Sequence, residues 1–143
     1  MPVSASDNRP HVLAIDDDSL ILRYLHIALE RAGYRPATLE DPLAVIEEIK
    51  GDPPDLILLD IRLPETDGFT LFAEIRSVSP SPVIFLSASN RAEDRNRALG
   101  LGASAFVVKP FSPAELMRTV EDVLSKYQGD SEGNGHTDGK AQA

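Results

Sequence analysis

The chain has 143 residues, a formal net charge of −9 and no cysteine. This length suits one domain with a hydrophobic core. The acidic balance argues against nucleic-acid binding by this chain, and the missing cysteines exclude disulfides and zinc–thiolate sites. No apolar run could span a bilayer and no signal-peptide pattern appears, so we expect a cytoplasmic protein without membrane contact.

Composition divides the chain into three parts. Residues 1–10 are polar and contain proline, which predicts a flexible lead-in. Residues 11–127 carry the apolar periodicity of one folded domain. Residues 128–143 have almost no apolar side chains, which predicts a disordered tail or a linker.

The first apolar run, residues 12–15, predicts a strand that ends at consecutive aspartates. A helix is expected over 20–32, with Asp18 as its N-cap and Gly33 after its last turn. Its apolar stripe consists of Leu22, Leu25, Leu29 and Ala32.

A weaker second strand is predicted over residues 34–39. Because it contains Pro36, and proline is tolerated in sheets mainly at an edge, we expect an edge strand. Asp41 and Pro42 then predict the start of a second helix that runs to about Lys50.

The third strand is predicted over residues 56–59, a continuous apolar run that stops at Asp60. A loop over 61–66 should lead to a third helix at Asp67-Gly68. The apolar face of that helix consists of Phe69, Phe72 and Ile75. A fourth strand over 83–86 ends at Ser87.

Asn90 and Glu93 predict a capping box at the start of a fourth helix, which should end near Gly100. A fifth strand over 105–108 precedes Lys109. Ser112-Pro113 should then start a last helix that runs to about Lys126. Strand and helix thus alternate five times, which predicts a doubly wound α/β fold: a five-stranded parallel sheet with helices on both faces.

Parallel strands bring their carboxyl ends to one edge of the sheet, where such folds place their chemistry. Here the strands end in Asp16, Asp17, Asp60, Ser87 and Lys109. Each could separately be a turn, cap or surface residue. Together they suit a Mg²⁺ site, with Asp60 as a nucleophile toward phosphorus and Lys109 and Ser87 contacting the phosphoryl oxygens.

These motifs resemble a known family, the receiver domain of bacterial two-component response regulators, with the CheY-like fold. The resemblance covers about residues 12–126. It rests on 12–17, Leu58-Leu59-Asp60, Pro64, Asp67-Gly68, Ser87-Ala88, Gly102-Ala103 and 106–111. It implies the sheet order 2-1-3-4-5 and a cis peptide bond between Lys109 and Pro110.

The resemblance also implies the site roles. Asp60 would accept a phosphoryl group from a phosphohistidine of a histidine kinase or histidine phosphotransfer protein. Mg²⁺ would be bound by Asp17, Asp60 and the backbone carbonyl of Arg62, with Asp16 acting mostly through water. Lys109 and Ser87 would read the phosphoryl group. The chain would be a signalling domain that catalyses only its own phosphorylation and dephosphorylation.

The family's switch would involve Ser87 and an inward turn of the aromatic residue on the fifth strand, here Phe106. Phe106 could also be an ordinary core residue, and many relatives carry tyrosine there. Output would use the face of helix 4, strand 5 and helix 5, toward a protein target that the sequence does not identify. Arg62 and Ser89 would tune dephosphorylation by flanking the path of the attacking water.

Ser104-Ala105 stands where DNA-binding regulators of the OmpR kind usually carry acids, which weakens the case for their dimerisation mode. We expect a monomer or a phosphorylation-promoted dimer.

Two other functions compete. A phosphatase of the haloacid dehalogenase type would use Asp16 as nucleophile and Asp18 two residues on, but Leu20 departs from its pattern and Asp60 would have no role. A docking module that never takes phosphate is the other. A nucleotide-binding domain is disfavoured because no glycine-rich loop follows the first strand.

Overall fold

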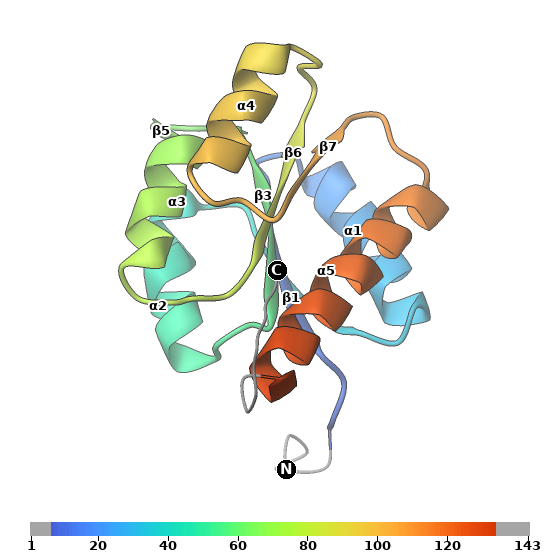
Figure 1. Cartoon of the computed structure of the whole chain (residues 1–143). Coiled ribbons are helices and arrows are strands. Elements are labelled where there is room, and N and C mark those ends of the chain that lie inside the picture. The colour runs from blue at the N-terminus through green and yellow to red at the C-terminus, as the bar shows by residue number, and fades with distance from the viewer. Residues whose placement is uncertain (1–6, 134–143) are drawn as a thin grey trace.

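The computed structural model describes residues 7–133 and has the predicted α/β architecture, built on one parallel sheet (Figure 1). The sheet order is β2-β1-β3-β6-β7, so the expected order is confirmed. Its strands are β2 (Arg35–Leu39), β1 (His11–Ile15), β3 (Leu56–Asp60), β6 (Val83–Ser87) and β7 (Ala105–Val108). The strand that contains Pro36 lies at an edge, as predicted.

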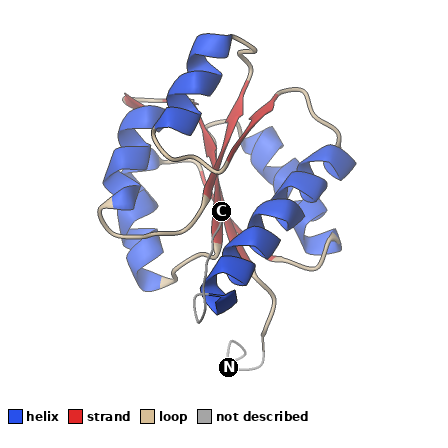
Figure 2. Ribbon diagram, in the orientation of Figure 1, coloured by secondary structure: helices blue, strands red, loops and turns tan. Residues whose placement is uncertain are grey.

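Helices cover both faces of this sheet (Figure 2). Helices α1 (Ser19–Arg31) and α5 (Pro113–Gly133) lie on one face. The other face is covered by α2 (Val45–Gly51), α3 (Gly68–Arg76) and α4 (Ala92–Gly100).

The apolar runs of the strands supply two separate cores. Along β1, Val12 and Ala14 pack toward α1 and α5, whereas Leu13 and Ile15 pack toward α2 and α3. All four side chains are buried, because alternate residues of a strand point to opposite faces and helices cover both. This arrangement explains why the central strands are continuous apolar runs without polar interruption.

Helix α1 follows its sequence signals closely. The Asp18 carboxylate accepts hydrogen bonds from the backbone N–H groups of Leu20 and Ile21, which confirms the predicted N-cap. Leu22, Leu25 and Leu29 are buried. Ala32 was wrongly placed on this stripe, because it is the exposed C-cap residue beyond the last turn.

Two segments contain elements that were not predicted. The predicted second helix begins with a short 3-10 helix, Pro42–Ala44, before α2, and the Asp41 carboxylate caps it at the N–H of Leu43. The predicted loop over 61–66 contains a two-stranded antiparallel ribbon made of β4 (Arg62–Leu63) and β5 (Thr66–Asp67).

The capping box predicted at Asn90 and Glu93 is wrong. Arg91 is the N-cap residue of α4, and its side chain makes no cap hydrogen bond but pairs with Glu93 instead. A capping box is instead present at the start of α5. There the N–H of Glu115 donates to Ser112 Oγ, and the N–H of Ser112 donates to Glu115 Oε1.

Helix α5 continues to Gly133, so its predicted end near Lys126 was wrong and the predicted tail, 128–143, begins within the helix. Residues 1–6 of the predicted lead-in and residues 134–143 of the predicted tail lie outside the described residues. Within 7–133, no helix combines the length and the apolarity needed to cross a membrane.

Candidate functional site

The carboxyl ends of β1, β3, β6 and β7 form one edge of the sheet, as the parallel pairing requires. The register aligns Ile15 with Leu59 and Ser87 with Val108. Asp16, Asp60 and Lys109 therefore lie at neighbouring positions, although they are far apart in the sequence.

Three carboxylates meet at this edge. Asp16, Asp17 and Asp60 each offer an oxygen, and these oxygens lie within 4.8 Å of one another. Asp16 is 1% exposed and Asp60 is 5% exposed, whereas Asp17 is exposed to solvent. A set of hard oxygen donors open to water on one side fits Mg²⁺, which needs one or two carboxylates and keeps several waters.

Lys109 supplies the positive charge of the pocket. Its Nζ donates a 2.8 Å hydrogen bond to Asp16 Oδ2 and lies 3.6 Å from Asp60 Oδ1. The backbone N–H of Lys109 donates to the carbonyl oxygen of Ser87 at 2.7 Å, which fixes the residue to the end of β6. The expected cis peptide bond between Lys109 and Pro110 is present.

The surroundings shift the pKa values of Asp60 and Lys109. Burial, together with the charge of Asp16, raises the pKa of Asp60 to about 6, although Lys109 and the Arg62 N–H act in the opposite direction. Burial acts to lower the pKa of Lys109, but its hydrogen bond to Asp16 and the charge of Asp60 raise it above the ordinary value. Lys109 therefore stays charged and limits the repulsion among the acids.

Asp16 and Asp18 are held by local hydrogen bonds. Asp16 Oδ1 accepts from the backbone N–H of Asp18, and its Oδ2 accepts from Lys109. Asp18 is engaged as the cap of α1 and does not belong to the carboxylate cluster. The phosphatase hypothesis, which needs Asp16 and Asp18 as a catalytic pair, therefore has no support from this geometry.

Ser87 and Ser89 form a short hydrogen-bonded turn after β6. Ser87 is 4% exposed, and its Oγ accepts a 2.9 Å hydrogen bond from the backbone N–H of Ser89. In this contact the hydroxyl acts as an acceptor, and accepting a hydrogen bond does not use its proton, which can be donated to another group.

The remaining predicted residues lie around this site. Arg62 has an exposed side chain, and its backbone pairs with Asp67 in the β4–β5 ribbon. Phe106 is half-buried and packs against the core on the α2–α3–α4 side of the sheet. This packing agrees with Phe106 being a core residue. Its role in a switch stays a prediction.

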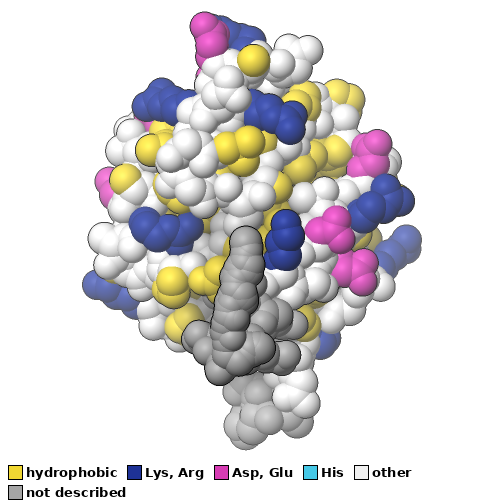
Figure 3. Space-filling model, in the orientation of Figure 1, with side chains coloured by type: hydrophobic (Ala, Val, Ile, Leu, Met, Phe, Trp, Pro, Cys, Tyr) yellow, Lys and Arg dark blue, Asp and Glu magenta, His cyan; other side chains and the backbone are white. Residues whose placement is uncertain are grey.

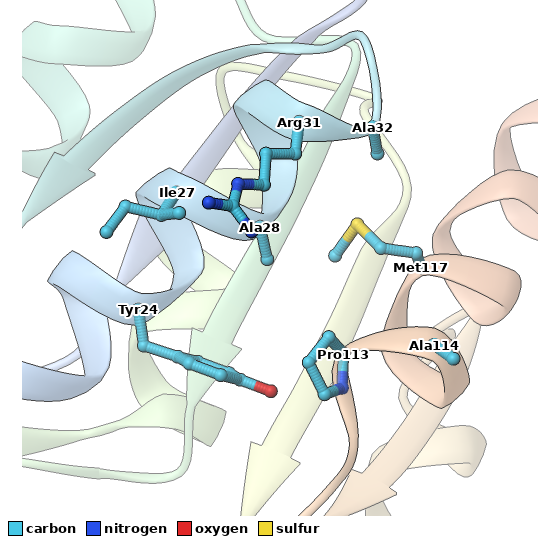
Figure 4. A pocket seen from close by; sticks show the side chains of 8 residues that line it. All are labelled: Tyr24, Ile27, Ala28, Arg31, Ala32, Pro113, Ala114 and Met117. Atoms are coloured by element: carbon cyan, nitrogen blue, oxygen red, sulfur yellow. The ribbon is translucent and has the colours of Figure 1, made fainter.

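An apolar groove between α1 and α5 was not predicted from the sequence (Figure 4). It has a volume of about 440 Å³. Its lining side chains are Tyr24, Ile27, Ala28, Arg31, Ala32, Pro113, Ala114 and Met117. The sequence signal that could have revealed it is Ile27, a large apolar residue outside the leucine stripe of α1, which is 46% exposed.

One residue of the groove, Tyr24, contacts the segment that follows Lys109. The rings of Tyr24 and Phe111 lie with their centroids 6.0 Å apart, and the Tyr24 hydroxyl donates to the carbonyl oxygen of Phe111. Phe111 follows Lys109 and Pro110 directly. Tyr24, which lines the groove, therefore contacts a residue that follows Lys109 by two positions in the chain.

The face formed by α4, β7 and α5 is partly apolar. In Figure 3, hydrophobic side chains gather over these elements, with both basic and acidic side chains around them. Leu99 and Leu101 are 40% and 48% exposed there. A hollow between β7 and α5 is lined by polar and apolar side chains: Ser104, Ala105, Thr119, Asp122, Val123, Lys126 and Tyr127.

Comparison with known proteins agrees with this geometry. The family model of the response regulator receiver domain matches residues 12–121. The chain is 39% identical to the transcriptional regulatory protein CseB of Streptomyces coelicolor over 138 residues, which is 95% of this chain and 58% of CseB. It is 36% identical to the transcriptional regulatory protein BaeR of Escherichia coli over 120 residues, covering 84% of this chain and 50% of BaeR. The chain thus spans about half the length of these curated relatives.

Solved structures show the same fold. A receiver domain protein (CheY-like) from Methanospirillum hungatei superimposes with a TM-score of 0.81 at 25% identity, covering 86% of this chain and 99% of that one. The BeF3-activated receiver domain of Klebsiella pneumoniae RstA gives a TM-score of 0.75 at 26% identity, covering 80% and 97%. The chain belongs to the response regulator receiver domain family of two-component signal transduction.

Proposed function

We propose that Asp60 is the phosphoacceptor of this receiver domain. The donor would be a phosphohistidine of a histidine kinase or of a histidine phosphotransfer protein, since receiver domains partner with histidine kinases. The observation that carries the proposal is the position of the Lys109 ammonium, 2.8 Å from Asp16 and 3.6 Å from Asp60. A cation held between two buried carboxylates suits an incoming phosphoryl group, whose charge it would neutralise.

The transfer needs Asp60 in its ionised form. A carboxylate oxygen of Asp60 forms a bond to phosphorus while the bond between phosphorus and the histidine nitrogen breaks, and the electron pair leaves with the imidazole. A pKa of about 6 leaves most of Asp60 ionised at neutral pH. Lys109 and the Ser87 hydroxyl would contact the oxygens of the transferred group.

Asp17, Asp60 and the backbone carbonyl of Arg62 would hold Mg²⁺, with Asp16 acting mostly through water. The cluster of carboxylate oxygens supports this assignment. The bound ion would supply charge neutralisation at the phosphoryl oxygens. The protein's own contribution is to fix Asp60 at the end of a buried strand, so that the nucleophile is oriented before the donor arrives.

We infer that the donor protein docks in the groove between α1 and α5. The groove is apolar, and its Tyr24 ring packs against Phe111, which follows Lys109 by two residues in the chain. A helix that presents apolar side chains would fill the groove and bring its phosphohistidine to the edge of the sheet that carries Asp60. Such a helix would cover the Ile27 side chain, which is 46% exposed in the groove.

Phosphorylation would shift the population of two conformations. The phosphoryl group adds a charge of about −1.5 to −2 beside the Ser87 hydroxyl, which would move toward it. Phe106 would then turn inward, and the face of α4, β7 and α5 would carry the change to a protein target. The exposed Leu99 and Leu101 on this face support a protein partner. The relatives that are transcriptional regulators suggest that the target is a DNA-binding output domain. We propose no DNA-binding residues within this chain.

Mass spectrometry of the intact protein tests the phosphoacceptor proposal. After incubation with Mg²⁺ and acetyl phosphate, a small phosphodonor, the wild-type chain should gain the mass of one phosphoryl group, and Asp60→Asn should gain none. No mass change in the wild type would instead favour a docking module that does not take phosphate.

A further inference from the structure

Gly68, the first residue of α3, packs directly against the backbone of Asp60. A Cβ atom placed on Gly68 would lie 2.6 Å from the Asp60 carbonyl oxygen and 2.8 Å from the Ile61 Cα. The N–H of Gly68 donates a 2.6 Å hydrogen bond to the carbonyl oxygen of Ile61. The start of α3 therefore touches the chain at the proposed acceptor and at the residue after it.

The need for glycine here is steric. Gly33 and Gly102 have positive φ angles, a backbone conformation that favours glycine over residues with a side chain. Gly68 has no such angle, but the space beside it is filled by backbone atoms. By contrast, a Cβ on Gly51 or on Gly100 would meet nothing within 4 Å.

A buried aromatic side chain crowds the same position beside Gly68. The Phe85 ring lies 3.1 Å from the same Cβ position, and Phe85 is fully buried. Its ring packs against Phe69 and Phe72, with centroids 5.4 Å and 5.7 Å away, and the Arg97 guanidinium covers the Phe69 ring. Because this aromatic cluster is close-packed, a side chain at Gly68 could not be accommodated by a retreat of α3 alone.

A methyl group at Gly68 must therefore displace the backbone of Asp60 and Ile61. Two groups of the proposed site depend on that backbone: the Asp60 carboxylate and the Arg62 carbonyl. A displacement of about 1 Å at a reacting group can cost about a hundredfold in rate, because the orientation of the reactants is lost.

We propose that Gly68 is a positioning residue, which sets the place of the Asp60 backbone and thereby the geometry of the acceptor carboxylate and of the Mg²⁺ ligands. This inference rests on the proposed function for its chemical consequence. The contact itself is independent of that function and can be measured without metal or phosphate.

The test compares Gly68→Ala with Gly51→Ala, a helical glycine in open space. In the metal-free proteins, two-dimensional NMR should show shifted amide signals for Asp60 and Ile61 in Gly68→Ala and unchanged ones in Gly51→Ala. NMR titration with Mg²⁺ should give a Kd about tenfold higher for Gly68→Ala, and phosphorylation by acetyl phosphate should slow by about tenfold to a hundredfold. Gly51→Ala should match the wild type in both.

A folded Gly68→Ala protein with the wild-type Mg²⁺ Kd would overturn the proposal, even if its Tm were lower, since the role would then be purely structural. If Gly68→Ala does not fold, the double variant Gly68→Ala/Phe85→Leu, which opens space behind the helix start, is compared with Phe85→Leu alone. A raised Mg²⁺ Kd in the double variant supports the proposal, and an equal Kd overturns it.

The same experiments distinguish a failure of the proposed function from a failure of the proposal for Gly68. A wild-type chain that neither binds Mg²⁺ nor takes phosphate would refute the function. The amide shifts of Asp60 and Ile61 would still report whether Gly68 positions that backbone.

Discussion

The Lys109 ammonium donates a 2.8 Å hydrogen bond to Asp16, which follows a strand that is not a neighbour of its own. In the sheet, β3 and β6 lie between β1 and β7. The Lys109 side chain therefore extends across the ends of β6 and β3. Its Nζ atom also lies 3.6 Å from Asp60 Oδ1. This contact links the end of β7 to the acidic cluster and places a positive charge beside Asp60.

Replacing Lys109 should separate phosphoryl transfer from metal binding. In Lys109→Met, phosphorylation by acetyl phosphate should slow by about a hundredfold or more, because the transferred charge loses its cation. The Kd for Mg²⁺ should not rise, because a positive charge has been removed from beside the carboxylates. Stopped-flow phosphorylation and Mg²⁺ titration measure the two effects. Lys109→Arg, which keeps the charge, should be less impaired, and an Mg²⁺ Kd that rises together with the loss of rate would contradict this account.

The stability of the metal-free protein should fall as pH rises from about 4 to about 6. The pKa of Asp60 is about 6 in the folded chain and near the ordinary value of 3.8 when unfolded, so in this window the folded state binds more protons. The expected loss in the free energy of unfolding is about 1–3 kcal/mol, allowing for partial solvent screening.

Urea unfolding at several pH values measures this effect, with Asp60→Asn as the control. The variant cannot titrate at this position, so its stability should lack the fall, and the difference between the two proteins isolates Asp60. The lowered pKa of Asp52, beside Arg35, acts with the opposite sign and at lower pH. A wild-type protein whose stability relative to Asp60→Asn does not change between pH 4 and pH 7 would refute the raised pKa.

A charge in the groove between α1 and α5 should block the protein donor alone. Ile27→Asp should slow phosphotransfer from a histidine kinase or phosphotransfer protein, because a carboxylate would be buried in an apolar interface. Phosphorylation by acetyl phosphate should stay at the wild-type rate, because that donor needs no groove. Leu43→Asp, at a residue that is 73% exposed and outside the groove, is the matched control. Equal slowing with both donors would place the effect in the site rather than in docking.

Arg62 should lengthen the life of the acyl phosphate. Its exposed side chain follows Asp60 by two residues on the β4–β5 ribbon, where it would shield the phosphorus from water. Arg62→Asn should therefore lose its phosphoryl group faster, measured as the decay of the phosphorylated mass after removal of the donor. Arg91→Asn, at an exposed arginine paired with Glu93, should decay like the wild type. An unchanged decay in Arg62→Asn would rule out shielding.

The sheet and the gathering of Asp16, Asp60 and Lys109 at one of its edges were predictable because the sequence signals are local and strong. Each central strand is a fully buried apolar run, so the polar residue that follows it, such as Asp60, stands out in the sequence. Parallel pairing then places these residues at one edge without further information. The edge position of β2 followed from Pro36 alone.

Other features depend on tertiary contacts that the sequence does not display. The β4–β5 ribbon has strands of two residues each, too short for any periodicity. The same capping pattern that failed at Asn90 is present in Ser112 and Glu115, and the reciprocal hydrogen bonds form only at the second place. The steric role of Gly68 depends on the backbone of a different element, which its own neighbours in sequence cannot reveal.

The position of the phosphoryl group is the most direct test of the central claim. The wild-type protein, treated with Mg²⁺ and acetyl phosphate and then reduced with borohydride, should yield one modified peptide, with Asp60 converted to homoserine. Reduction at Asp16 or Asp17 instead, or no modified peptide under conditions that label another receiver domain, would contradict the assignment of Asp60 as the acceptor.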